Sequence, residues 1–221
     1  MLISLIIPTY NERKNLPRLV KRIHKSLSEI DYEVIIVDDN SPDGTGELAE
    51  KLSKTYPIKV IHKKERGLAL AVVTGFKYAR GENLLVMDAD LQHPPERIPY
   101  FLKEIENADI VIGTRCMSSL TFKRKIISKG AKLLVMILFP LIRKLKEPHS
   151  GFFMLKKKVI EGIKLEPVGF KILLEILLKG NYKDVVEVPF IFEKRREGKS
   201  KLNVREILNF LRHVLSLKLG F

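Results

Sequence analysis

The first half of the chain alternates short apolar runs with segments of helical character. The apolar runs cover residues 2–7, 34–37, 58–61, 83–87 and 109–113. Residues 2–7 have the composition of a strand that is buried on both faces of a sheet, 34–37 read as a second buried strand, and the other runs also read as strands. Helical segments are expected between them, at residues 11–30, 45–54, 67–79 and 94–107. This alternation predicts an α/β fold with a parallel, doubly wound sheet, in which ligands bind at the carboxyl ends of the strands.

An acidic motif follows the run at residues 83–87 directly. Asp88 and Asp90 stand one residue apart, and Gln92 continues the same spacing. In a continuing strand these three side chains would share one face, because side chains alternate. Three oxygen ligands suit a hard divalent cation, which bridges carboxylates to phosphates. The alternative is a strand that ends in a solvated acidic turn.

Other polar residues are expected at the same edge of the sheet. The residues that follow predicted strands there are Tyr10, Asp38, Asp39, Asp88 and Asp90. Because the carboxyl ends of parallel strands meet at one edge, we expect these side chains to form one ligand site.

Composition limits the class of protein. The chain has 221 residues and a formal charge of +14, which calls for an anionic partner: nucleic acid, an anionic membrane surface or a phosphorylated substrate. The single Cys116 excludes an intramolecular disulfide and suits a reducing compartment. No signal peptide is expected at the first strand. The longest apolar run, residues 133–139, is shorter than the roughly 18 residues of a membrane span.

The second half has a different pattern. Strands are expected at residues 151–155 and 185–192, with a helix at 170–179 between them. A basic loop occupies residues 194–201, and an amphipathic helix at 205–219 ends the chain, docked on the domain or lying on lipid. The segment at residues 123–144 is basic at both ends and apolar between. It has the pattern of a helix in a membrane interface, and the alternative is a core helix.

Several stretches together resemble the family 2 glycosyltransferases, which have the GT-A fold. Two of them are typical of the whole superfamily: Ile6-Ile7-Pro8-Thr9-Tyr10-Asn11-Glu12 and Val37-Asp38-Asp39-Asn40-Ser41-Pro42-Asp43-Gly44-Thr45. The stretches at 87–95, 124–130, 150–153 and 195–201 are similar, more specifically, to polyprenyl-phosphate sugar synthases of the dolichyl-phosphate mannose synthase type. The resemblance covers nearly the whole chain. It implies a Rossmann-like, mostly parallel sheet flanked by helices, with C-terminal interfacial helices.

The resemblance also implies an activity and a set of site residues. The family transfers a sugar, usually mannose from GDP-mannose, to dolichyl or another polyprenyl phosphate with inversion. The implied metal ligands, for Mg²⁺ or Mn²⁺, are Asp88, Asp90 and Gln92. The implied catalytic residues are Asp90, Arg115, Arg124 and Arg195. The implied substrate-binding residues are Pro8, Tyr10, Glu12, Val37, Asp38, Asp39, Ala89, Ser128, Ser200 and Lys201.

Within that set, the resemblance divides the roles between two substrates. Arg115, Arg124, Ser128, Arg195 and Lys201 would surround the acceptor phosphate and the leaving group. One departure is Glu147, where the family usually has Asp three residues before Ser150-Gly151-Phe152. The loop at residues 116–122 also looks shorter than in relatives.

We expect one catalytic domain over residues 1–221, with a nucleotide-sugar half at 1–115 and an acceptor- and membrane-facing half at 116–221. A lipid-tailed acceptor implies that the protein is peripheral at the cytoplasmic face of a membrane. The expected partner is an anionic membrane surface, and a membrane-protein partner is left open. No nucleic-acid partner is expected.

Some alternatives stay open at this point. His93 is either a further metal ligand or a structural loop residue, and Lys63, Lys64 and Arg66 either reach phosphates or lie in a solvated loop. The donor could be another nucleotide sugar, such as UDP-glucose, or the acceptor a soluble molecule. A sugar-1-phosphate nucleotidyltransferase would need a glycine-rich loop after the first strand, and residues 8–11 do not form one. A nucleic-acid-binding module would explain the charge but not the acidic trio.

Overall fold

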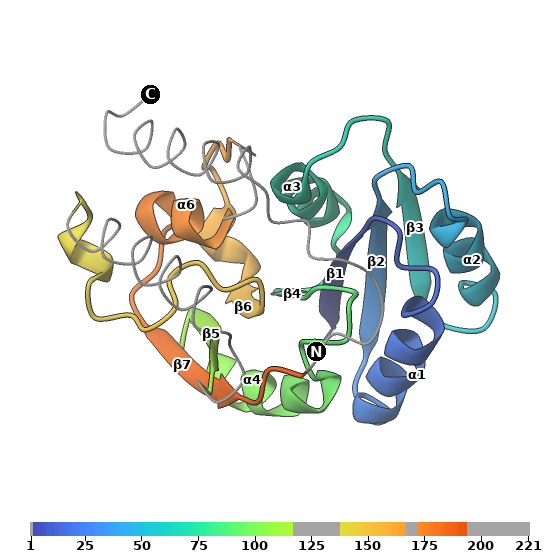
Figure 1. Ribbon diagram of the computed structural model, residues 1–221. Helices are drawn as coiled ribbons and strands as arrows, with labels where there is room; N and C mark the ends of the chain where they lie inside the picture. Colours follow the sequence, from blue (N-terminus) through green and yellow to red (C-terminus); the bar gives the residue numbers. More distant parts are fainter. Residues whose placement is uncertain (1, 117–137, 167–171, 194–221) are drawn as a thin grey trace.

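The computed structural model describes residues 2–116, 138–166 and 172–193, and these contain a seven-stranded sheet (Figure 1). Across the sheet the strands are β3 (Ile58–His62), β2 (Tyr32–Asp38), β1 (Ile3–Thr9), β4 (Asn83–Val86), β6 (Phe153–Lys156), β5 (Ile110–Arg115) and β7 (Val185–Phe190). The apolar runs of the sequence therefore form strands where they were predicted, within a few residues.

The direction of β6 differs from the expected parallel sheet. It pairs antiparallel with both β4 and β5, whereas the neighbouring pairs β1–β2, β1–β4, β2–β3 and β5–β7 are parallel. The reason is that the chain leaves β5 at the carboxyl edge of the sheet and enters β6 at the same edge. The sheet is therefore mixed, although mostly parallel.

Helices cover both faces of this sheet. The longer ones are α1 (Leu16–Ser26), α2 (Thr45–Leu52), α3 (Leu68–Tyr78), α4 (Ile98–Ile105) and α6 (Ile172–Lys179), and the short 3₁₀ helices are Pro95–Arg97, Pro140–Ile142 and Lys157–Ile160. Buried side chains of α3 and α6 pack on one face, and those of α1, α2 and α4 pack on the other (Figure 1). Strand residues alternate between these two cores, as expected for strands buried on both faces.

The first helix starts later than predicted. A helical segment was expected from residue 11, but α1 begins at Leu16. The backbone N–H of Asn11 donates to Ser41 Oγ at 3.0 Å, and that of Glu12 donates to Thr45 Oγ1 at 2.9 Å. Asn11 also has a φ of +59°, outside the helical region. Contacts to the next loop therefore replace a helical turn here.

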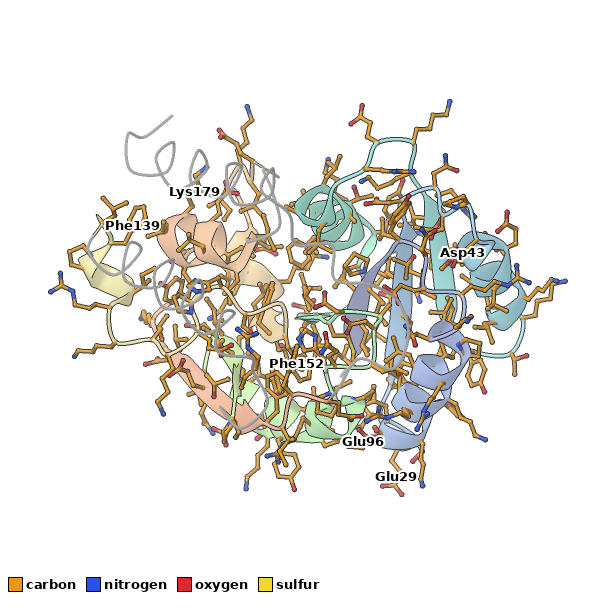
Figure 2. The ribbon with its side chains drawn as sticks, in the orientation of Figure 1. Glu29, Asp43, Glu96, Phe139, Phe152 and Lys179 are labelled. Carbon is orange, nitrogen blue, oxygen red and sulfur yellow. The ribbon has the colours of Figure 1, made fainter. Side chains whose placement is uncertain are left out.

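Residues 123–144 were predicted to form a helix in a membrane interface, and the structure describes this segment from residue 138 onward. There, the prediction is wrong. Phe139 is only 7% exposed, and it packs with Ile142 into the core on the α3 and α6 face (Figure 2). Pro140 starts a 3₁₀ turn instead of continuing a helix to residue 144. For Phe139 and Ile142 the core alternative is therefore correct, because their side chains meet other apolar side chains. Residues 123–137 lie outside the described part of the chain.

Asp109 joins the amino ends of β5 and β7 to the carboxyl end of the antiparallel strand β6. Its Oδ1 lies 2.8 Å from Lys158 Nζ, its Oδ2 accepts the Lys183 N–H at 2.9 Å, and its backbone oxygen accepts the Lys156 N–H at 3.0 Å. The bond from Lys158, followed by the one from the Lys183 backbone, lowers the pKa of Asp109 to about 2. The ionised carboxylate is therefore part of the folded state.

We expect Asp109→Asn to lower the free energy of unfolding by about 1–2 kcal/mol at pH 7. A depressed pKa stabilises the fold above the unfolded value, near ~3.9, and this contribution is lost as the pH falls towards ~2. The difference between the two proteins should therefore shrink by about half near pH 3. Urea unfolding at both pH values measures it, with exposed Asp184→Asn as the control. An equal difference at pH 7 and pH 3 would show that the charge of Asp109 is not responsible.

Candidate functional site

The carboxyl edge of the sheet brings the predicted site residues together. β1 lies between β2 and β4, so the strand order reverses at β1, and such a switch point is where α/β sheets bind ligands. A narrow crevice lies at this point, and its lining includes Pro8 of β1, Asp88 after β4, and Gly151 before β6. A Cβ atom on Gly151 would stand 3.4 Å from Asp88 Oδ2, so the glycine leaves room beside that carboxylate.

The acidic motif forms a turn and not a strand. β4 ends at Val86, and Leu91 has a φ of +64°, so side chains do not alternate through residues 88–92. Asp90 is buried, with 5% exposure, and its Oδ1 accepts the Gln92 N–H at 3.0 Å. The side chain of Asp88 is 40% exposed. The argument that the trio shares a strand face was therefore wrong, because the strand ends before it.

His93 holds the first residue of this turn, Asp88, by a hydrogen bond to its backbone. Its Nδ1 accepts the backbone N–H of Asp88 at 3.1 Å. The ring is buried and stacks on Phe152 with 5.1 Å between centroids. The structural interpretation of His93 is therefore the one that its contacts support.

Gln92 is tied to a residue far along the chain. Its Nε2 donates to the backbone oxygen of Glu193 at 3.1 Å, and the Glu193 N–H donates to the backbone oxygen of Gln92 at 3.1 Å. The Glu193 carboxylate in turn lies 2.6 Å from Arg22 on α1. Sequence reasoning missed both Glu193 and Arg22, because no local pattern links residues so far apart. Since the amide nitrogen of Gln92 is used, its amide oxygen is the atom suited to a cation.

Asp38 and Asp39 shape the neighbouring loops. Asp38 is 2% exposed and accepts hydrogen bonds from Thr9 Oγ1 at 2.9 Å, the Ser41 N–H at 2.9 Å and Ser41 Oγ at 2.6 Å. Asp39 lies 3.1 Å from Lys63 Nζ and accepts the Gly67 N–H at 2.9 Å. Both carboxylates therefore hold the loops that follow the strands, whatever else they bind.

Arg66 contacts Tyr10, the residue that follows β1. The guanidinium of Arg66 is 4.4 Å from the centre of the Tyr10 ring, and Arg66 is exposed. Glu12 accepts a bond from Asn15 Nδ2 at 2.8 Å. Of the three basic residues left open, Lys63 therefore pairs with Asp39, and Arg66 stacks on a predicted nucleotide-binding residue.

Arg115 ends β5 and meets Glu147. Its Nε is 3.0 Å from both carboxylate oxygens of Glu147, and its guanidinium lies 5.3 Å from the centre of the Phe192 ring. The residue that departs from the family pattern is therefore the partner of a predicted catalytic arginine. Val37 and Ala89 are buried apolar residues at the same edge.

Several predicted residues lie outside the described residues, namely Arg124, Ser128, Arg195, Ser200 and Lys201. Within the described residues, no group of three or more His, Cys, Asp or Glu side chains is placed to hold a metal ion. No helix among the described residues is long and apolar enough to cross a membrane.

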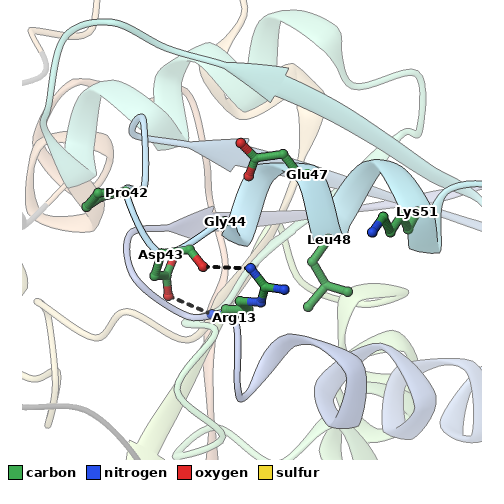
Figure 3. A pocket seen from close by; sticks show the side chains of 7 residues that line it. All are labelled: Arg13, Pro42, Asp43, Gly44, Glu47, Leu48 and Lys51. Carbon is green, nitrogen blue, oxygen red and sulfur yellow. Dashed lines mark hydrogen bonds between the residues drawn. The ribbon is translucent and has the colours of Figure 1, made fainter.

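A larger hollow of about 320 Å³ lies between the first loop and α2 (Figure 3). It is lined by Arg13, Pro42, Asp43, Gly44, Glu47, Leu48 and Lys51. Within it, Arg13 Nη1 donates to the backbone oxygen of Asp43 at 3.1 Å, and the Arg13 N–H donates to Asp43 Oδ2 at 3.2 Å. These bonds join the loop after β1 to the loop before α2. Neither Asp88 nor Asp90 lines this hollow.

The mostly parallel sheet, with an acidic turn beside its switch point, defines the class of the fold as α/β with its candidate site at the carboxyl edge. The chain belongs to glycosyl transferase family 2, whose sequence profile matches residues 4–163. It is 53% identical over 224 residues to the dolichol-phosphate mannosyltransferase of Pyrococcus furiosus, covering 98% of this chain and spanning 64% of that protein. It is 36% identical over 233 residues to the protein of the same name from Saccharomyces cerevisiae, covering 97% of this chain and 86% of that protein.

Solved structures confirm the GT-A fold. Glucosyl-3-phosphoglycerate synthase from Mycobacterium tuberculosis, in complex with Mn²⁺, UDP and glucosyl-3-phosphoglycerate, matches with a TM-score of 0.76 over 99% of this chain and 78% of that chain. Its complex with Mg²⁺ and UDP also matches with a TM-score of 0.76. The sequence identities of 16% and 17% make this a likeness of fold alone.

Proposed function

We propose that this chain transfers mannose from GDP-mannose to the phosphate of dolichyl or another polyprenyl phosphate, with inversion at the sugar. The observation that carries the proposal is the meeting of the acidic turn, Arg115 and the switch-point crevice at one edge of the sheet. The names of the relatives support the choice of substrates.

The donor set of the acidic turn fits a divalent cation. Asp88, Asp90 and Gln92 offer two carboxylates and an amide oxygen, which are the hard ligands that Mg²⁺ and Mn²⁺ prefer. Such a set leaves coordination positions for phosphate oxygens, as in other Mg²⁺ sites that also bind substrate. When bound, the cation neutralises the charge that the leaving diphosphate gains. The likeness to structures that contain Mn²⁺ or Mg²⁺ supports this assignment.

The acceptor needs positioning more than deprotonation. A phosphate monoester has a second pKa near ~6, so the acceptor is largely a dianion at neutral pH. Bringing it towards another anion requires fixed cationic donors, and a planar guanidinium suits a phosphate. Among the described residues at this edge, we assign this role to Arg115.

The acceptor chemistry also determines where the protein works. The tail of a polyprenyl phosphate is confined to lipid, so the active site must reach the head-group plane. The formal charge of +14 favours anionic lipid. We therefore place the chain, as part of this proposal, at the cytoplasmic face of a membrane as a peripheral protein.

The test is a panel of nucleotide sugars offered to the protein with vesicles of anionic lipid that contain dolichyl phosphate. The expected result is mannosyl phosphate lipid from GDP-mannose in the floated vesicle fraction, together with the protein. If product forms from UDP-glucose alone, GDP-mannose is not the donor and UDP-glucose takes its place in the proposal. Transfer to a soluble acceptor in preference to the lipid would overturn the acceptor assignment and the membrane location together.

A further inference from the structure

The loop that leads into β6 is held in place from β7. Glu187, which pairs in register with Ile112 of β5, accepts the backbone N–H groups of Lys146 at 2.7 Å and Glu147 at 3.2 Å. The backbone oxygen of Glu147 then accepts the Ser150 N–H at 3.1 Å. Glu147 is therefore fixed at its backbone on both sides and is not a freely moving loop residue.

From this fixed backbone, the Glu147 side chain reaches Arg115. Both carboxylate oxygens lie 3.0 Å from Arg115 Nε, and neither side chain is more than 25% exposed. The ring of Phe192 lies 5.3 Å from the centre of the guanidinium. A carboxylate on Nε and an aromatic ring beside the guanidinium together restrict its rotation.

With Nε bonded to Glu147, the two Nη atoms of Arg115 are the part of the guanidinium that could bind a phosphate. Nε carries one of its five N–H donors, and the two Nη atoms carry the other four. With Nε facing Glu147, the Nη atoms form the opposite end of the planar group. An arginine whose orientation is fixed beforehand stabilises a phosphate without a reorganisation cost during the reaction.

We propose that Glu147 is a positioning residue: it holds Arg115 so that the Nη atoms face the phosphate of the acceptor. This inference rests on the proposed function. It gives Glu147 no proton to transfer, in keeping with an acceptor that is already ionised at neutral pH. It also explains why glutamate serves at this position, because its reach brings both oxygens to Arg115 Nε.

The experiment is a double-mutant cycle of Glu147→Ala and Arg115→Ala, with exposed Glu161→Gln as the control. Turnover is measured against acceptor and donor concentrations, and binding of a short, water-soluble isoprenyl monophosphate is measured by calorimetry. We expect Glu147→Ala to lower kcat/KM for the acceptor by about 10- to 100-fold, the range seen when the partner of a fixed active-site group is removed. KM for GDP-mannose should be unchanged. In the Arg115→Ala background, removing Glu147 should add no further loss in either measurement.

Additive losses would overturn the proposal, because they would show that Glu147 acts independently of Arg115. A loss of the acidic limb of the pH–rate profile on removing Glu147 would instead identify a general base and overturn it as well. If the alanine variant does not fold, Glu147→Asp decides: it keeps the charge and shortens the reach, so a weakened affinity for the isoprenyl phosphate is expected. A parent that binds this probe but transfers no sugar would refute the proposed function, and the binding cycle would still test Glu147.

Discussion

Replacing Asp90 with asparagine is expected to abolish sugar transfer while the protein remains folded. The asparagine amide oxygen still accepts the Gln92 N–H, so the turn around Leu91 is preserved. The substitution removes one of the two negative charges offered to the cation. Stabilisation of a leaving diphosphate by a cation is worth several kcal/mol, which corresponds to a loss of about 1,000-fold or more in turnover.

Three measurements check this expectation. Thermal unfolding should show a midpoint close to that of the parent, and calorimetric titration with Mn²⁺ in the presence of GDP should show weakened binding. EDTA should inactivate the parent, and added Mg²⁺ or Mn²⁺ should restore it. Asp184→Asn, an exposed change of the same kind at the amino end of β7, serves as the control. Full activity of the parent in EDTA, or of the Asp90→Asn variant, would disprove the metal assignment.

Replacing Phe152 with alanine is expected to have the largest effect on stability. Its side chain is fully buried at the centre of the molecule (Figure 2), with ring centroids 4.5 Å from Phe101, 5.1 Å from His93 and 5.3 Å from Phe190. Removing a buried phenyl ring leaves a cavity and costs about 3–5 kcal/mol. The change also removes the surface on which His93 stacks, so the turn that carries Asp88 should loosen.

Urea unfolding gives the stability, and turnover at a temperature where the variant is still folded gives the effect on the site. Phe152→Leu fills most of the cavity and should lose less than half as much stability. The alanine variant should lose turnover even where it is fully folded. A loss below about 1 kcal/mol would contradict a tightly packed aromatic cluster at this position.

Much of the architecture follows from local pattern. Short apolar runs between helical segments predict strands, and all five runs of the first half form strands. The carboxyl-edge site follows as well, because every parallel strand delivers its next residues to the same edge. The direction of β6 could not be predicted in this way, since periodicity is the same for parallel and antiparallel strands. The path of the chain between β5 and β6 decides it.

For the acidic motif, too, the sequence predicts one part of the result and the tertiary structure decides the other. Composition and spacing predict that Asp88, Asp90 and Gln92 are cation ligands, because their oxygen atoms have the chemistry of hard ligands. Their arrangement depends on where β4 ends, and hydrogen bonds in the turn decide that. The difference in exposure between Asp88 and Asp90 follows from the turn and not from strand alternation.

The sequence by itself determined the fold class, the edge of the sheet where ligands are expected and the residue types that lie there, because each of these follows from short-range periodicity and chemistry. The tertiary structure alone decided the partners: Asp39 with Lys63, Arg115 with Glu147, and Gln92 with Glu193, which are separated by 24, 32 and 101 residues. It also decided that Phe139 is a core residue. An apolar run has the same pattern against lipid as against protein, and only the packing of α6 and the sheet provides its actual surroundings.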